Sequence, residues 1–353
     1  MTSKENTKKL LLCHFEAYPR LQIRDIFKFI YQSSFGCEHM ISDVSRASEM
    51  IRSEYDGISA ERADMTTPLD GDFSRVDLSL LDYGIKAETF GKLFYMSSKC
   101  KTVGLPKLQQ MLEAADELIL CGKLPFSHSE FTSAVNEWAA QGYPAVHHSD
   151  AFREAYKPAY RVLSKKYVPY LPLFAKLDMM LEAGPVRLAI EGGSAVGKTT
   201  LSRALEEIYG CSVFHMDDFF LRPEQRTPER FAEPGGNVDR ERFLSEVLLP
   251  LSKGEDMITY RPFDCSVFDL GSAVTIRPGK LCVIEGAYSM HPELEGFYDV
   301  SVFIDLPAKE RRSRILKRNP DMADRFFNEW MPMEDRYFRE MNVKERCTFT
   351  IEL

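Results

Sequence analysis

The sequence has no excess of positive charge and no long hydrophobic run. Its 45 Lys and Arg residues are outnumbered by 53 Asp and Glu residues, for a formal net charge of -8. General binding to a nucleic-acid backbone is therefore not expected. No apolar run approaches the roughly 18 residues of a membrane span, and the N-terminal residues lack a signal-peptide pattern. These absences predict a cytoplasmic protein with no nucleic-acid partner and no membrane partner.

Paired cysteines are also missing. The eight cysteines are scattered along the chain and form no C-x-x-C motif, which indicates reduced residues rather than a disulfide scaffold. What the chain does contain is ample core material, because 44% of its 353 residues are hydrophobic and 28% are charged. That length favours two domains over one.

The first part of the chain, residues 1–180, is predicted to be a mainly helical domain. Apolar residues recur there at helical spacing, and helix-capping residues stand at several of the expected starts. Residues 57–84 are rich in Gly, Asp, Ser and Thr and have little periodicity, which favours a loop or a poorly ordered crossing. Helices are expected over residues 105–121 and 21–32, from Ser127 with Glu130 towards Gln141, and from Ser149 to just before Pro158.

The second part, residues 181–353, changes character near Gly184-Pro185. Short β-branched runs alternate there with helical patterns, which predicts an α/β domain with a mostly parallel sheet and helices on both faces. The boundary between the domains is expected between about residues 178 and 186. The alternating segments are 186–191, 198–209, 212–216, 240–251, 281–285, 300–306 and 308–318.

A phosphate-binding loop follows the first of these predicted strands. Residues 192–199 match the pattern G-x-x-x-x-G-K-S/T, placed between a strand and a helix as in a P-loop NTPase fold. Glycines let successive backbone N–H groups converge on phosphate oxygens, and the helix presents its positive end to the same anion. Lys198 can reach the β- and γ-phosphates, and the Thr199 hydroxyl can ligate Mg²⁺. The predicted nucleotide-binding residues are Gly192, Gly193, Ser194, Ala195, Val196, Gly197, Lys198, Thr199 and Thr200.

Carboxylates stand at the ends of two further predicted strands. Asp217 and Asp218 follow the strand at 212–216, and Glu285 ends the strand at 281–285. One aspartate can accept a proton from an attacking hydroxyl, while the other orients that hydroxyl or holds a magnesium-bound water. Glu285 occupies the position from which an acid holds Mg²⁺ through water or supports the base. Two solvated loop aspartates are the alternative. Thr199, Asp217 and Glu285 are the predicted metal-binding residues.

A basic helix is predicted over residues 308–318. Several of its cations are spaced to face one way, so they can close over a transferring phosphoryl group and stabilise its charge. A solvated basic helix face is the alternative. Arg314 is the first candidate for the closing role, and Arg318 is the next. Arg318 is expected to bind the nucleotide. The cations are Lys309, Arg311, Arg312, Arg314, Lys317 and Arg318.

Together these motifs resemble the uridine kinase, phosphoribulokinase and pantothenate kinase group of P-loop small-molecule kinases. The resemblance runs from Val186 to the end and depends on the phosphate-binding loop, Asp217–Phe220, Glu285-Gly286 and the arginine helix. In that group the first aspartate of a D-x-F-Y/F segment is the general base, a role that the resemblance gives to Asp217. Residues 215–220 also resemble nicotinamide riboside kinases, so nucleosides are the leading acceptor class.

Two partial matches extend the resemblance to acceptor binding. Residues 237–239 are similar to the N-F-D segment of uridine kinases, which implies that Asp239 holds ribose hydroxyls, although Arg240-Glu241 replaces the usual His-Pro. Residues 260–264 resemble the segment that closes on the base, without the histidine that follows in uridine kinases. The implied acceptor-binding residues are Asp218, Asp239, Tyr260, Phe263 and Tyr288.

The end of the chain resembles the same group less closely. Asn319-Pro320 follows Arg318, without the further arginines that uridine kinases have there. Residues 330–338 are similar to the closing helix of the fold, which is interpreted as a structural element or as a wall of the acceptor pocket.

The first half of the chain carries polar residues that no motif explains. If the fold brings them together, they can form a metal or small-ligand site; otherwise they are polar residues at helix ends beside a buried thiol. We expect this helical region to cover the acceptor site or to supply a regulatory ligand site. Tyr156, Tyr160 and Arg161 can belong to a domain interface or a ligand pocket. The unexplained residues are Cys37, Glu38, His39, His147 and His148.

The function that the sequence favours is ATP-dependent phosphoryl transfer to a hydroxyl of a small molecule, most of all a nucleoside. Asp217 would accept the proton, and Lys198 and Arg314 would stabilise charge on the transferring group. Pantothenate- or sugar-type acceptors stay open, because the segments that close on the base match only in part. A regulatory P-loop NTPase switch is the other alternative, although the N-K-x-D and L-S-G-G-Q segments are absent.

Overall fold

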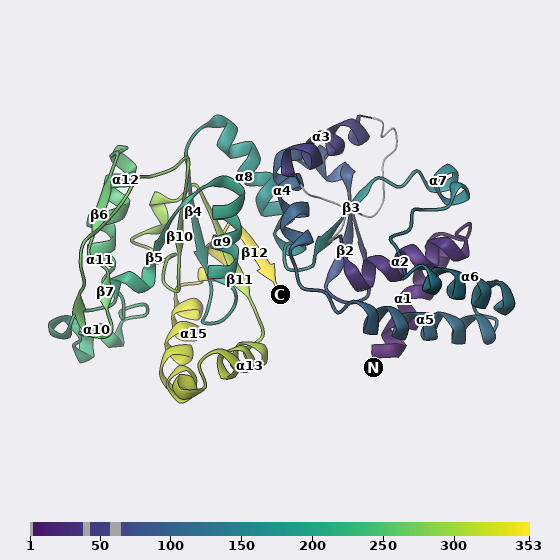
Figure 1. The fold of residues 1–353 in the computed structure, drawn as a ribbon. Helices are drawn as coiled ribbons and strands as arrows, with labels where there is room; N and C mark the ends of the chain where they lie inside the picture. Colours follow the sequence, from purple (N-terminus) through teal and green to yellow (C-terminus); the bar gives the residue numbers. More distant parts are fainter. Residues whose placement is uncertain (1–2, 38–42, 57–64) are drawn as a thin grey trace. The chain divides into compact units, whose positions relative to one another are not determined.

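The computed structural model describes residues 3–37, 43–56 and 65–353, which divide into two compact units (Figure 1). The first unit is Met1–Ala175 and the second is Lys176–Leu353. The dividing point lies inside helix α8, Leu171–Ala183. Among the described residues, no helix combines the length and the apolar character needed to cross a membrane.

Helices make up most of the first unit, as predicted. The amphipathic stretch at 105–121 forms α5, and Pro106 stands in its first turn. The side chain of Ser127 caps α6 by accepting the backbone N–H of Glu130, and Ser149 caps α7 in the same way through Phe152. The helices are α1 (Ser3–Ala17), α2 (Ile23–Phe35), α3 (Val44–Tyr55), α4 (Ala87–Ser98), α5 (Leu105–Leu120), α6 (His128–Ala140) and α7 (Asp150–Tyr156).

A three-stranded antiparallel sheet corrects the prediction of a loop over 57–84. Strand β2 (Phe73–Asp77) lies between β1 (Thr66–Pro68) and β3 (Tyr160–Ser164). Four of the five β2 residues are buried, among them Ser74 and Arg75, so the strand has no alternation of apolar and polar residues that sequence could reveal. Residues 57–64 of that predicted loop lie outside the described residues.

The second unit is built on a five-stranded parallel sheet, which confirms the predicted α/β class. The strand order is β12-β11-β4-β10-β5. Strand β4 lies at the centre, and its carboxyl end leads directly into the phosphate-binding loop. The strands are β4 (Val186–Glu191), β5 (Ser212–His215), β10 (Leu281–Glu285), β11 (Val300–Asp305) and β12 (Phe349–Glu352).

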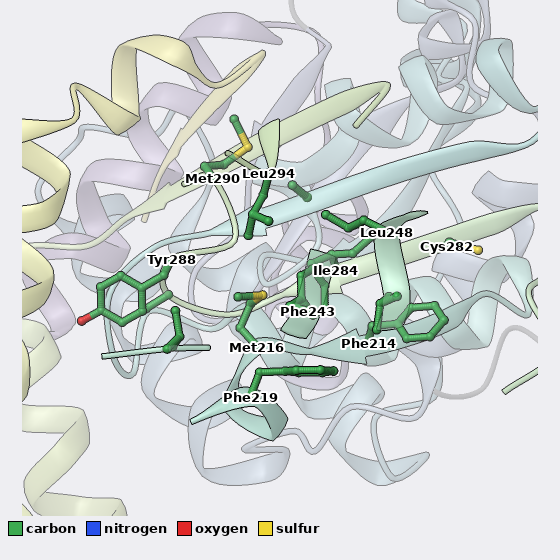
Figure 2. Close-up of a cluster of buried hydrophobic side chains, with 14 of the residues drawn as sticks. Phe214, Met216, Phe219, Phe243, Leu248, Cys282, Ile284, Tyr288, Met290 and Leu294 are labelled. Carbon is green, nitrogen blue, oxygen red and sulfur yellow. The ribbon is translucent and has the colours of Figure 1, made fainter. Parts of the chain in front are cut away.

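Helices cover both faces of this sheet. Helix α9 (Lys198–Tyr209) contacts β4, β5 and β10. On the other face, Phe243 and Leu248 pack with Phe214 and Ile284 in a buried cluster to which α9 contributes nothing (Figure 2). The remaining elements are α10 (Pro228–Ala232), α11 (Arg240–Phe243), α12 (Leu249–Lys253), β6 (Ile258–Tyr260), β7 (Phe263–Asp264), β8 (Asp269–Leu270), β9 (Val274–Ile276), α13 (Ala308–Arg318), α14 (Ala323–Arg325), α15 (Met331–Glu340) and α16 (Val343–Arg346).

Candidate active site of the second unit

The candidate site lies at the carboxyl edge of the parallel sheet. The register pairs Glu285 of β10 with Ile190 of β4 on one side and with His215 of β5 on the other. These three strands therefore end at the same level, where ligands bind in open parallel sheets. The phosphate-binding loop, the turn that carries Asp217, and Glu285 all meet at this edge.

The phosphate-binding loop needs its glycines. Gly192 has a φ of 146° and Gly197 a φ of 117°, both in the region that favours glycine. A Cβ on Gly192 would also lie 2.6 Å from the carbonyl oxygen of Ile304. The Nζ of Lys198 donates to the carbonyl oxygens of Gly192 (2.8 Å) and Gly193 (3.0 Å). The lysine thus lies over the loop where a nucleotide's phosphates would bind.

Glu285 brings the loop helix and β5 together. Its Oε1 accepts the Thr199 hydroxyl at 3.1 Å and lies 2.8 Å from Nδ1 of His215. Burial alone would raise the pKa of Glu285, but the His215 hydrogen bond and the Lys198 charge lower it. Glu285 is therefore a carboxylate, and its Oε1 lies beside a hydroxyl.

These two residues fit a magnesium ion. Hydroxyl and carboxylate oxygens are the hard ligands that Mg²⁺ binds through one or two protein groups, together with water and substrate phosphates. Among the described residues, no group of three or more His, Cys, Asp and Glu side chains is arranged to hold a metal. Thr199 and Glu285 would hold the ion together with the nucleotide, rather than as a closed protein cage.

Asp217 stands in the turn after β5 and is exposed to solvent. The surrounding protein raises its pKa by desolvation, and Glu285 adds to this, while Lys198 lowers it. The neighbouring Asp218 has a different environment, because its Oδ2 accepts the hydroxyl of Tyr260 at 2.9 Å. The two aspartates are thus distinct: Asp217 is exposed, while Asp218 is hydrogen-bonded to Tyr260 of β6.

Asp239 is held by the protein itself. It caps α11, where its Oδ1 accepts the backbone N–H of Arg242 at 3.0 Å, and its Oδ2 accepts Nε2 of Gln225 at 2.8 Å. Only 3% of the residue is exposed. An acceptor that binds here has to compete with these contacts. The other two implied acceptor-binding residues, Phe263 and Tyr288, are also buried, and Tyr288 has a φ of 76°.

The arginines of α13 divide into two kinds. Arg314 and Arg318 are exposed, and Nη1 of Arg314 donates to the carbonyl oxygen of Val196 at 3.1 Å. Arg311 is buried and reaches the carbonyl oxygen of Ser194 through its Nε at 3.3 Å. Arg311 and Arg314 therefore contact the backbone of the phosphate-binding loop, whereas Arg318 lies at the exposed end of the helix.

Glu334 of α15 lies in the segment 330–338 that resembles the closing helix of the fold, but its role at the phosphate-binding loop was not predicted. It accepts the backbone N–H of Ser194 at 2.9 Å and the Ser194 hydroxyl at 2.5 Å. Nη2 of Arg311 donates to the same carboxylate at 2.5 Å, and both side chains are almost fully buried. A buried ion pair between α13 and α15 therefore holds one residue of the loop.

Glu191 is a second residue missed from the sequence, although it directly precedes the first glycine of the loop. Its carboxylate is fully buried and accepts backbone N–H groups from Gly192 (2.8 Å), Tyr288 (3.2 Å) and Met290 (3.0 Å). The Tyr337 hydroxyl donates to it at 3.2 Å. Burial raises the pKa of Glu191 to about 7, against the effect of these hydrogen bonds. The carboxyl thus ties the start of the loop to the segment after β10.

The unexplained polar residues of the first half are only partly described. Cys37 is buried, its Sγ lies 3.8 Å from the carbonyl oxygen of Phe94, and burial raises its pKa to about 12. His147 is exposed, and His148 is buried beside Asp25. Glu38 and His39 lie outside the described residues. Of the five residues, the described ones are Cys37, His147 and His148, and they belong to no group of described residues that could hold a metal.

Several bacterial uridine kinases are similar in sequence to the second half of this chain. No family model matches it. The uridine kinase of Chlamydia pneumoniae is 30% identical over 144 residues, which are 37% of this chain and 63% of that enzyme. The chain thus spans less than two thirds of the length of this relative. Other bacterial uridine kinases match at 23 to 27% identity.

A sugar kinase is also among the relatives. The bifunctional alpha-galactosidase/sucrose kinase of Mediterraneibacter gnavus is 29% identical over 157 residues, which are 38% of this chain and 17% of that enzyme. Among solved structures, a possible uridine kinase from Bacillus stearothermophilus has 24% identity and a TM-score of 0.39, and the match covers 51% of this chain and 98% of that one. The second half of the chain is thus similar in sequence to bacterial uridine kinases, and it combines a parallel sheet with a phosphate-binding loop.

Proposed function

We propose that this protein is an ATP-dependent phosphotransferase that phosphorylates a hydroxyl of a small molecule, with a nucleoside as the leading acceptor. The observation that carries the proposal is the meeting of three groups at one sheet edge: the phosphate-binding loop after β4, Glu285 at the end of β10 and Asp217 after β5. We assign this activity to residues 181–353, with residues 1–180 as a separate domain.

The chemistry that we assign to the chain's own residues is positioning and charge stabilisation. Lys198 would leave the loop carbonyl oxygens and bind the terminal phosphates of ATP. Asp217 would accept the proton of the attacking hydroxyl, a role that its raised pKa favours because the carboxylate then holds the proton more tightly. Arg314, which already donates a hydrogen bond to the carbonyl oxygen of Val196 in the loop, would stabilise charge on the phosphoryl group being transferred. Mg²⁺, held with Thr199 and Glu285, would neutralise phosphate charge.

The acceptor side rests on the residues around β6 and the segment after β10. The Tyr260–Asp218 hydrogen bond fixes one carboxylate beside Asp217. Tyr288 and Phe263 would line the apolar part of the acceptor pocket, and Asp239 would bind sugar hydroxyls if Gln225 moves away from its Oδ2. A ribose or another sugar, which presents hydroxyls beside an apolar face, fits this combination. Uridine and sugar acceptors are therefore the first to be tested.

The test compares Asp217→Asn with Asp218→Asn in the full-length protein. ATP affinity is measured by titration calorimetry, and acceptor-stimulated ADP release is measured with a panel of nucleosides, pantothenate and sugars. Asp217→Asn is expected to bind ATP as the wild type does and to lose ADP release at saturating acceptor. Asp218→Asn is expected to raise the KM for the acceptor by a larger factor than it lowers kcat. Wild-type turnover in Asp217→Asn would refute the base assignment, and ADP release that no acceptor stimulates would favour an NTPase switch.

A further inference from the structure

A buried polar cluster occupies the core of the first unit, far along the sequence from the kinase motifs. Its members come from α1, α2, β2, β3 and the N-terminal end of α7. All except Tyr160 are buried, so Tyr160 is the member nearest to solvent. The cluster consists of His14, Asp25, Lys28, Gln32, Arg75, His148 and Tyr160.

The one carboxylate of the cluster is fully engaged. Asp25 accepts the backbone N–H groups of Gln22 (2.9 Å) and Ser149 (3.0 Å), the Ser149 hydroxyl (2.6 Å) and Nδ1 of His148 (2.9 Å). Burial would raise its pKa, but the hydrogen bonds from His148 and Ser149 outweigh burial and lower it to about 2. Asp25 is therefore charged. Its oxygens accept hydrogen bonds from Gln22, His148 and Ser149, and not from Lys28 or Arg75, the two cations of the cluster.

Those two cations have no carboxylate partner. Arg75 is 4% exposed; its Nε donates to Gln32 at 2.8 Å, and its Nη1 lies 3.5 Å from Nε2 of His14. No described residue accepts a hydrogen bond from its Nη2. Lys28 is 9% exposed, and its one hydrogen bond among the described residues goes to the carbonyl oxygen of Val146, at 3.3 Å. Among the described residues, neither forms an ion pair. Burial and then the charge of Arg75 lower the pKa of Lys28 to about 8, which leaves it mostly protonated at neutral pH.

The two histidines add no charge. Burial lowers the pKa of His148 to about 4 and that of His14 well below its usual range. Because Arg75 can only donate, Nε2 of His14 has to accept, which places the proton on Nδ1. That Nδ1 is buried and has no hydrogen-bond partner within the described part of the chain. The cluster thus holds two cations against one anion, and two buried donors in it have no acceptor.

Buried charges are normally paired, and buried donors normally have an acceptor, so this cluster lacks a negatively charged acceptor. We propose that it binds a small oxyanion, the carboxylate or phosphate group of a small molecule, with Arg75 and Lys28 as the charged contacts and Nδ1 of His14 as a further donor. Tyr160 marks the side from which the ligand enters. Since Nη2 of Arg75 has no contact with solvent, the ligand has to open the cluster as it binds.

The chain offers a local reporter for this site. It has two tryptophans: Trp138, which is buried in α6 of the first unit, and Trp330 in the second. In a full-length Trp330→Phe protein, thermal unfolding followed by tryptophan fluorescence reports the first unit alone. Inorganic phosphate and succinate are added separately, at constant ionic strength set with chloride. At least one of them is expected to raise the unfolding temperature, and the one that does so identifies the group.

Three further variants test the assignment. The rise is expected to disappear with Arg75→Gln, with affinity at least tenfold weaker, and to persist with Arg161→Gln, which removes an arginine of β3 that is already paired with Glu54. It is also expected to persist with Lys198→Met, which separates it from the phosphate-binding loop. If Arg75→Gln does not fold, Lys28→Met serves in its place. No rise with either anion, a rise that survives loss of the cation, or a rise that Lys198→Met abolishes would overturn the proposal.

Discussion

Replacing Arg311 with methionine is expected to destabilise the second unit by about 3 to 5 kcal/mol, the usual consequence of removing one partner of a buried ion pair. The side chains of Arg311 and Glu334 are only 7% and 6% exposed. Without the guanidinium, the Glu334 carboxylate stays buried with only the N–H and hydroxyl of Ser194 as donors. The loss therefore comes from an uncompensated charge rather than from a missing contact.

The assay is hydrogen exchange of peptides from β4 and β10 at increasing urea, which gives the free energy of opening of the central strands. Arg339→Met is the matched control on α15: its contact with Glu340 is 3.8 Å long and Arg339 is 72% exposed, so its loss is expected to change stability by less than about 0.5 kcal/mol. The double variant Arg311→Met/Glu334→Met removes both charges and is expected to regain stability over Arg311→Met. A loss below about 1 kcal/mol in Arg311→Met, or no gain in the double variant, would refute the reasoning.

Three further predictions concern single residues of the second unit. The Glu285 hydrogen bond raises the pKa of His215, so protonated His215 stabilises the fold below about pH 6.5, and this stabilisation is lost as pH rises through the raised pKa. The difference in urea stability between wild type and His215→Gln is therefore expected to shrink as pH rises, and it is well under about 1 kcal/mol because the side chain is 43% exposed. A difference that grows with pH would contradict this prediction. Burial raises the pKa of Glu191 to about 7, so the folded protein holds this proton more tightly than the unfolded chain. The stability of the wild type relative to Glu191→Gln is expected to fall by up to about 3 kcal/mol as pH rises from about 4.5 to 7. A stability difference between the two proteins that does not change with pH would contradict this prediction. A Cβ on Gly193 would lie 2.4 Å from Nη2 of Arg311, so Gly193→Ala is expected to lose about 1 to 3 kcal/mol of stability in urea unfolding. Gly184→Ala is the control, and its stability is expected to change little because no atom lies within 4 Å of the added Cβ. Equal losses of stability in the two variants would contradict the predicted clash.

The arrangement of the phosphate-binding loop and Glu285 was predictable because the sequence patterns that indicate it are local. Each of β4, β5 and β10 is a short apolar run with its polar residue at the carboxyl end, and parallel pairing places such ends at one edge. Thr199 and Glu285, named separately from their motifs, lie within hydrogen-bond distance of each other for this reason. The predicted helices of the first unit share this property, because periodicity and capping residues are also local.

What the sequence did not reveal depends on long-range packing. Glu334 contacts Ser194 across 140 positions of sequence, and nothing in the residues around Glu334 indicates that contact. Strand β12, which completes the sheet next to β11, follows no alternating pattern long enough to be recognised. Strand β2 is hidden for a related reason, since Arg75 is buried on a central strand.

The most direct test of the account is transfer of the γ-phosphoryl group itself. The full-length protein is incubated with MgATP and each member of the acceptor panel, and the products are examined by mass spectrometry. We expect that one hydroxylated small molecule, a nucleoside first of all, gains a single phosphoryl group while an equal amount of ADP appears, and that Asp217→Asn forms neither product. ADP that appears without any phosphorylated acceptor, at the same rate with and without the panel, would contradict a kinase.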